Sequence, residues 1–222
     1  MTRPTEMSPS LPRRRAASPA HSRRVATLSA VAGLALTIAG CASPPSRFYT
    51  LSDAAATAST TAPATAYVIE VSPVAVPEQV DRPQIVVTKG GGRVDILEES
   101  RWAAPLKNEL TSAISRDLTQ QLGAIDVYGL PRGDNVTSYR ISTSVQRFES
   151  VPGEQAALTA VWSVRRVPGD GVVTCRFSAT EPASGGIPEV VAAQRKLVDQ
   201  LASGIGHAIA ASASGATPRC DG

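Results

Sequence analysis

Histidine is nearly absent from this sequence: His21 and His207 are the two in 222 residues. A Ser-His-Asp or Cys-His catalytic site would have to use one of them as its base. The sequence also contains no H-x-x-x-H, C-x-x-C or G-x-S-x-G pattern, and its three cysteines and two histidines are few ligands for a zinc site. We therefore expect no catalytic residues, no metal site and no enzymatic activity.

Aromatic residues are also scarce, at 4% of the chain, so the core must be built from Val, Ile, Leu and Ala. The formal net charge of +3 comes from 22 basic and 19 acidic residues. Residues 1–40 hold six Arg and one Glu, which leaves 16 basic and 18 acidic residues in the rest of the chain. The positive charge thus belongs to the N-terminal segment, and we expect no nucleic-acid partner.

The N-terminal forty residues have the three parts of a secretory signal peptide. A basic region contains Arg13, Arg14 and Arg15, residues 25–39 are apolar or small, and the segment ends in Ile38-Ala39-Gly40-Cys41. The apolar run is shorter than the roughly 20 residues that a membrane-spanning helix needs. The final four residues resemble the lipobox of bacterial lipoproteins.

This resemblance implies that Cys41 becomes the lipid-bearing first residue of the mature protein. The alternative is an ordinary cysteine in a membrane anchor. Ala42 follows the cysteine where Asp would resemble an inner-membrane retention signal, so we expect an anchor at the periplasmic face of the outer membrane. We expect no cofactor apart from this covalent lipid.

The remaining two cysteines, Cys175 and Cys220, could form a disulfide in the oxidising periplasm. The alternative for Cys175 is a small core residue, because it lies between Val173 and Phe177 in a strand-like run.

The composition divides the chain into four parts. Residues 1–40 are the signal peptide, 41–66 hold the lipidated cysteine, an aromatic motif and a flexible linker, 67–211 form the domain, and 212–222 form a disordered tail. The small, polar residues 52–66 could extend about 50 Å at about 3.4 Å each. A linker of this length would allow the domain to lie away from the membrane.

An amphipathic helix is the clearest element within the domain. It begins at Pro105, ends before Gly123 and repeats apolar residues at spacings of three and four. Its other face, with Lys107, Glu109, Arg116 and Asp117, is predicted to be solvated. A second helix opens near Pro188, and the glycines within it at 204 and 206 suggest close packing.

The other periodic segments predict strands. They cover residues 67–76, 84–88, 93–97, 125–128, 139–148, 156–167 and 171–179. Glycines 90–92 between the second and third segments predict a hairpin turn. The fold class is therefore α+β, with a mixed, largely antiparallel sheet and two main helices packed on it.

Four short motifs resemble the auxiliary lipoprotein of lipid-trafficking ABC systems, the PqiC-like family. They are Phe48-Tyr49-Thr50-Leu51, the Pro-Val-Ala-Val-Pro run at 73–77, Trp102-Ala103-Ala104-Pro105-Leu106, and Val161-Trp162. We interpret Trp102, Pro105 and Leu106 as a structural motif rather than a catalytic one.

The resemblance implies a lipoprotein that docks on an MCE-family protein and helps phospholipid or another hydrophobic molecule cross between membranes. Because MCE proteins form rings, it also implies that the lipoprotein could be a homo-oligomer. The docking residues that we predict are Phe48, Tyr49 and Leu51, and the alternative is that they complete the domain's own sheet. The alternative function is a lipoprotein regulator of a peptidoglycan synthase.

Overall fold

The computed structural model describes residues 44–52, 65–133 and 135–220. The predicted signal peptide, Cys41 and most of the predicted linker lie outside these residues. The α+β fold class is confirmed: within the described residues, two helices accompany two mixed sheets whose strands are mostly antiparallel.

The larger sheet has the strand order β2-β5-β6-β7, with β2 at Tyr67–Val71, β5 at Thr137–Val151, β6 at Gln155–Val167 and β7 at Val172–Pro182. β5, β6 and β7 are antiparallel neighbours, whereas β2 runs parallel to β5. Side chains of β5 alternate between buried and exposed, because successive residues of a strand face opposite sides of the sheet.

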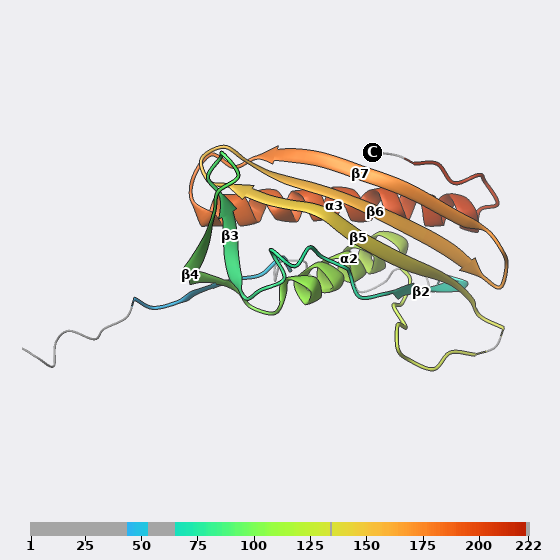
Figure 1. Ribbon diagram of the computed structural model, residues 1–222. Helices are drawn as coiled ribbons and strands as arrows, with labels where there is room; N and C mark the ends of the chain where they lie inside the picture. The colour runs from blue at the N-terminus through green and yellow to red at the C-terminus, as the bar shows by residue number, and fades with distance from the viewer. Residues whose placement is uncertain (1–43, 53–64, 134, 221–222) are drawn as a thin grey trace, which may run out of the picture. The chain divides into compact units, whose positions relative to one another are not determined.

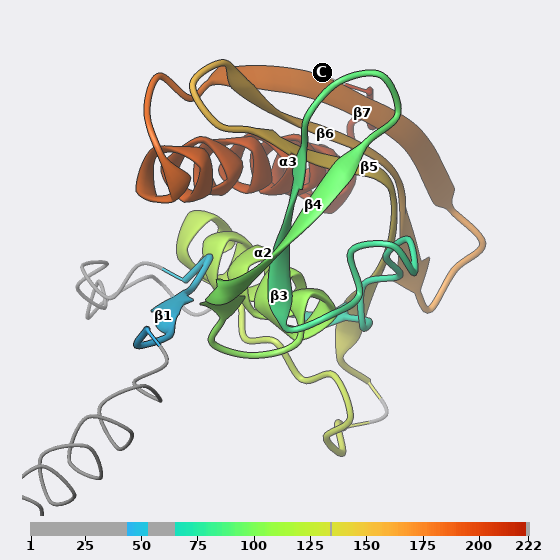
Figure 2. The same cartoon turned by 60° about the vertical axis from the view of Figure 1, so that its left-hand side comes forward.

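Two helices, α2 (Leu106–Leu122) and α3 (Ile187–Ala213), cover one face of this sheet (Figures 1 and 2). α2 has the predicted bounds, and Gly123 ends it in the left-handed conformation that glycine adopts easily. The predicted close packing is confirmed at Gly206, where an added Cβ would collide with the side-chain amide of Gln121. The helices and the sheet enclose one hydrophobic core.

A smaller sheet has the order β1-β4-β3, with β1 at Arg47–Tyr49, β3 at Gln84–Thr88 and β4 at Val94–Trp102. β3 and β4 form the predicted hairpin, in which the three glycines 90–92 all have positive φ. The hairpin stands at the same end of the domain as the β5–β6 turn (Figure 1). β1 pairs with β4 in parallel, which joins the segment after Cys41 to the domain.

Several strand ends differ from the prediction; β2 ends at Val71 rather than at residue 76, and β4 continues to Trp102 rather than ending at residue 97. Three further predictions need correction. The folded unit begins near Pro45 rather than at residue 67, because β1 belongs to the smaller sheet. Residues 125–128 form an isolated bridge rather than a strand: Ile69 donates its N–H to the Ile125 carbonyl, and Val127 donates to Ile69. The last helix continues to Ala213, two residues into the segment predicted as tail.

Candidate functional site

The residues that follow the predicted anchor are fixed to the domain on both sides of Tyr49. In the register of β1 with β4, Arg47 lies opposite Ser100 and Tyr49 lies opposite Trp102. The N–H of Ala103 donates to the Tyr49 carbonyl at 2.7 Å. Leu51, two residues further along the chain, is 1% exposed and belongs to the core. This segment is therefore an integral part of the fold.

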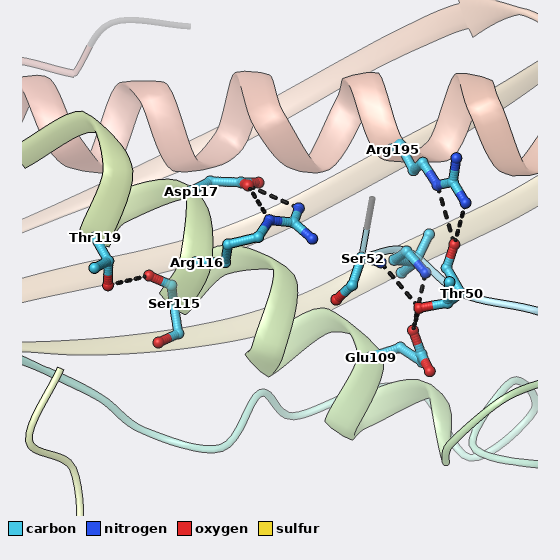
Figure 3. A network of polar contacts seen from close by, with 9 residues as sticks. Thr50, Ser52, Glu109, Ser115, Arg116, Asp117, Thr119 and Arg195 are labelled. Atoms are coloured by element: carbon cyan, nitrogen blue, oxygen red, sulfur yellow. Dashed lines mark hydrogen bonds and ion pairs between the residues drawn. The ribbon is translucent and has the colours of Figure 1, made fainter. Parts of the chain in front are cut away.

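A buried carboxylate at the start of α2 holds the same segment from inside. Glu109 is 6% exposed. Its Oε2 atom accepts from the Thr50 hydroxyl at 2.7 Å (Figure 3) and from the backbone N–H of Leu51 at 2.9 Å. Its Oε1 atom accepts from the N–H of Ala104 at 3.0 Å. One side chain thus satisfies donors from two of the three motifs that precede it in the sequence, the aromatic motif and the Trp-Ala-Ala-Pro-Leu motif.

The second helix contributes a cation to this arrangement. The guanidinium of Arg195 on α3 donates to the Thr50 carbonyl from Nε at 3.0 Å and from a terminal nitrogen at 2.8 Å. Thr50 is therefore held by α2 through its hydroxyl and by α3 through its carbonyl. We call Thr50, Leu51, Ala104, Glu109 and Arg195 the Glu109 network.

The Trp-Ala-Ala-Pro-Leu motif forms the other half of the same structural unit. Trp102 is buried at the end of β4, with its ring 6.2 Å from that of Phe148 in an edge-to-face arrangement. Pro105 occupies the N-cap position of α2 and Leu106 opens its buried stripe. The motif turns the chain from β4 into α2 and presents Glu109 to the residues after Cys41.

The prediction that Glu109 lies on a solvated face is wrong. A usable signal was present in the sequence, because Glu109 follows Leu106 by three residues and precedes Ala113 by four, which places it on the apolar stripe. A carboxylate can be buried there because Thr50, Leu51 and Ala104 supply hydrogen bonds that replace water.

Further along α2, a charged pocket opens toward α3. Arg116 and Asp117 form an ion pair at 2.8 Å (Figure 3). Burial raises the pKa of Asp117 above its ordinary value, and the hydrogen bond and charge of Arg116 oppose part of that rise. The pocket also contains Lys196 and Asp199, so cations and carboxylates share its walls and give it a mixed charge.

The three predicted docking residues have different environments. Leu51 is buried and Tyr49 packs against the core, so both complete the domain's own structure. Phe48 is 66% exposed and presents its ring to the outside. The edge of β2 that faces away from β5 is covered by residues 125–127.

Cys175 and Cys220 are joined by a disulfide, with their Cα atoms 5.5 Å apart. Cys175 lies on the buried face of β7, and the bond ties the segment after α3 to that strand. Cys220 is thus attached to the domain, although it falls in the segment that was predicted to be a disordered tail.

His207, the histidine that a hydrolytic site would need, is exposed on α3. Within residues 44–52, 65–133 and 135–220, no group of three or more His, Cys, Asp or Glu side chains is arranged to hold a metal ion. The same residues contain no helix that is long and apolar enough to cross a membrane.

Comparison with protein families decides what kind of protein has this arrangement. The model of the ABC-type transport auxiliary lipoprotein component matches residues 49–206, from the second residue of the aromatic motif to the close contact of α3 with α2. The chain belongs to this family. The family consists of lipoproteins that assist ABC-type transporters, so its members are membrane-anchored transport components rather than a recognised group of enzymes.

Solved structures support the fold of this auxiliary lipoprotein. A crystal structure of an uncharacterised protein covers 75% of this chain and 99% of its own, with a TM-score of 0.59 and 18% identity. A Xanthomonas campestris protein of the DUF330 family covers 67% of this chain and 87% of its own, with a TM-score of 0.53 and 18% identity. No curated protein sequence matches the chain.

Proposed function

We propose that this auxiliary lipoprotein is anchored in the outer membrane through a lipid on Cys41. In this proposal it docks on the MCE-family protein of an ABC transport system that moves phospholipid or another hydrophobic molecule between the two membranes. The family match supports the transport role. The observation that supports the proposed arrangement of anchor and domain is the Glu109 network, because it makes the segment after Cys41 a fixed part of the domain.

The position of β1 determines how far the domain can lie from the anchor. Five residues, 42–46, separate Cys41 from Arg47. Fully extended, this connection spans about 20 Å at about 3.4 Å per residue. The predicted linker at 52–66 follows β1 and so adds no length to the connection. The partner must therefore reach a domain held near the membrane.

The most suitable partner surface lies on the segment beside β2. Ile125, Tyr128 and Leu130 are three of the large hydrophobic side chains that are exposed in the described part of the chain. Figure 1 shows β2 and this segment at the other end of the domain from the blue strand β1. An exposed cluster of aromatic and aliphatic side chains is typical of a protein interface. At this end of the domain, it is accessible to a partner approaching across the periplasm.

Co-purification tests the docking. Ile125, Tyr128 and Leu130 would all be replaced by Ser, and the purified variant mixed with the MCE protein. We expect loss of co-purification with unchanged thermal melting, whereas Ile96→Ser, an exposed residue of the smaller sheet, should leave binding intact. Retention of binding by the triple variant would contradict this surface. In a parallel mixture with a purified peptidoglycan synthase, capture of the synthase but not of the MCE protein by the native protein would favour the alternative function.

The anchor is tested separately in cells. Cys41→Ser should remove the acylated mass and release the protein from the outer-membrane fraction. An acylated variant that still sediments with the outer membrane would contradict lipidation at Cys41.

A further inference from the structure

The smaller sheet has an exposed apolar face next to the predicted anchor. Phe48 of β1 and Val94 and Ile96 of β4 are all exposed. Phe48 lies opposite Arg101, whose neighbours Ser100 and Trp102 are buried, so Phe48 belongs to the outward side of the sheet. Val94 and Ile96 are on the same side as Arg101, because all three pair with one face of β3: Val94 with Thr88, Ile96 with Val86 and Arg101 with Gln84. The side chains of β3 that alternate with these partners, Ile85 and Val87, are buried.

The sheet that carries these side chains is also the one joined to Cys41. Residues 42–46 can separate Arg47 from the lipidated residue by about 20 Å at most. β1 cannot move away from β4 to lengthen this distance while Leu51 is in the core and Glu109 binds Thr50. The exposed face therefore stays within a short distance of the bilayer that receives the lipid.

We propose that the outer face of the β1-β4-β3 sheet lies against the membrane, with Phe48 in the lipid interface and Ile96 and Val94 facing the same surface. This inference rests on the proposed lipidation of Cys41. The occupant is the membrane rather than a protein because the connection is so short. A weak apolar contact suffices, since attachment through Cys41 raises the effective concentration of the bilayer at this face.

Net charge contributes little to this contact. Arg101 pairs with Glu98 at 3.8 Å, and Arg93 pairs with Asp95 at 3.8 Å. These opposite charges balance each other on or near the face, so the apolar side chains carry the attraction. The contact should accordingly persist when salt screens the charges of the lipid headgroups.

The disulfide makes a direct test practical. With Cys175 and Cys220 bonded to each other, Cys41 is the one remaining thiol among the three cysteines. Oxidised protein starting at Cys41 would be coupled through this thiol to a maleimide lipid. The vesicles would contain phosphatidylethanolamine, phosphatidylglycerol and brominated phosphatidylcholine, whose bromines quench tryptophan emission. Because the lipid is attached chemically, the test does not depend on lipidation in the cell.

Phe48→Trp and Ile96→Trp report on the proposed face, and Tyr128→Trp beside β2 is the matched control. The native Trp102 and Trp162 are buried and give a constant background. We expect quenching of Phe48→Trp at least about twofold greater than that of Tyr128→Trp, since interfacial side chains enter the headgroup and acyl boundary by about 5–10 Å. High salt should not remove the difference.

Two results would overturn the proposal. Equal quenching of Phe48→Trp and Tyr128→Trp would show that the domain has no preferred face toward the bilayer. Protection of Phe48→Trp from aqueous iodide only after the MCE protein is added would identify this face as a protein contact. Either result leaves lipidation of Cys41 and docking through the segment beside β2 to their own tests.

Discussion

Replacing Glu109 is the most informative perturbation, because this carboxylate joins the segment after the predicted anchor to α2. Glu109→Ala removes the acceptor for the N–H groups of Leu51 and Ala104 and for the Thr50 hydroxyl. It leaves the fold's other hydrogen-bond partners in place. The expected consequence is loss of stability together with release of β1.

The magnitude follows from the exposure of the three donors. The Leu51 hydrogen bond is buried, so its N–H would lose its partner with no water to replace it, at a cost of about 1–3 kcal/mol. The Thr50 and Ala104 donors are partly buried and can recover some hydrogen bonding from water. We expect Glu109→Ala to lower the free energy of unfolding by about 2–4 kcal/mol in total.

Glu109→Gln separates shape from charge. The amide keeps one acceptor oxygen, but it directs an NH₂ group toward a donor and loses the charge that strengthens such hydrogen bonds roughly twofold. Its expected loss is about 1–2 kcal/mol, between that of Glu109→Ala and that of the wild type. Glu98→Ala is the control, because that carboxylate is on the surface and should matter by less than about 0.5 kcal/mol.

Urea denaturation of the four proteins gives the stabilities, and hydrogen exchange shows where the structure opens. The Leu51 amide should exchange faster in Glu109→Ala. The exchange rates of amides in β5 and β6 should change only as far as the global free energy of unfolding changes. Equal stability of Glu109→Ala and Glu98→Ala, or unchanged exchange at Leu51, would refute the structural role of the network. Release of β1 would also lengthen the connection from Cys41 to Tyr67 to about 90 Å.

Three further predictions concern the core, the disulfide and the pH dependence. Leu110→Ala should lower the free energy of unfolding by about 2–5 kcal/mol, because the side chain is fully buried on α2; an unchanged urea midpoint would place it outside the core. Reducing the Cys175–Cys220 bond, which closes a loop of 45 residues, should cost about 4 kcal/mol in the chain-entropy model, and thiol counting on non-reduced mature protein should find neither cysteine free. Because its pKa is raised, the Asp117 carboxyl contributes stability at low pH that is lost as pH rises above about 3.9. The free energy of unfolding of Asp117→Asn, measured in urea, should therefore rise relative to that of the native protein across that range. A constant difference at every pH would contradict this reading.

The periodic segments predicted most of the secondary structure because their signals are local. The apolar repeat and Gly123 gave the bounds of α2, and the three glycines at 90–92 gave the β3–β4 turn. The ends of β5 were harder to predict. Residues such as Glu149 and Ser150 are polar, and they join the strand because β6 supplies pairing partners for them.

The prediction failed where a residue's environment depends on distant parts of the chain. Residues 125–128 look like a strand, yet they form only a bridge beside β2. Glu109 looks like a surface residue, and its burial depends on donors from Thr50 and Leu51, more than fifty residues away in sequence. Composition predicted a small, polar linker at 52–66, but it left open whether the aromatic motif before it is a docking site or part of the domain's own sheet. The pairing of β1 with β4 depends on the whole fold.

The sequence by itself determined the elements, the α+β class and the family motifs, because backbone propensity and apolar spacing act over a few residues. It also located the predicted anchor at Cys41. The tertiary structure alone decided how that anchor region meets the domain, through the pairing of β1 with β4 and the burial of Glu109. Strand pairing and the satisfaction of a buried carboxylate both require partners brought together by the whole fold, which no local pattern encodes.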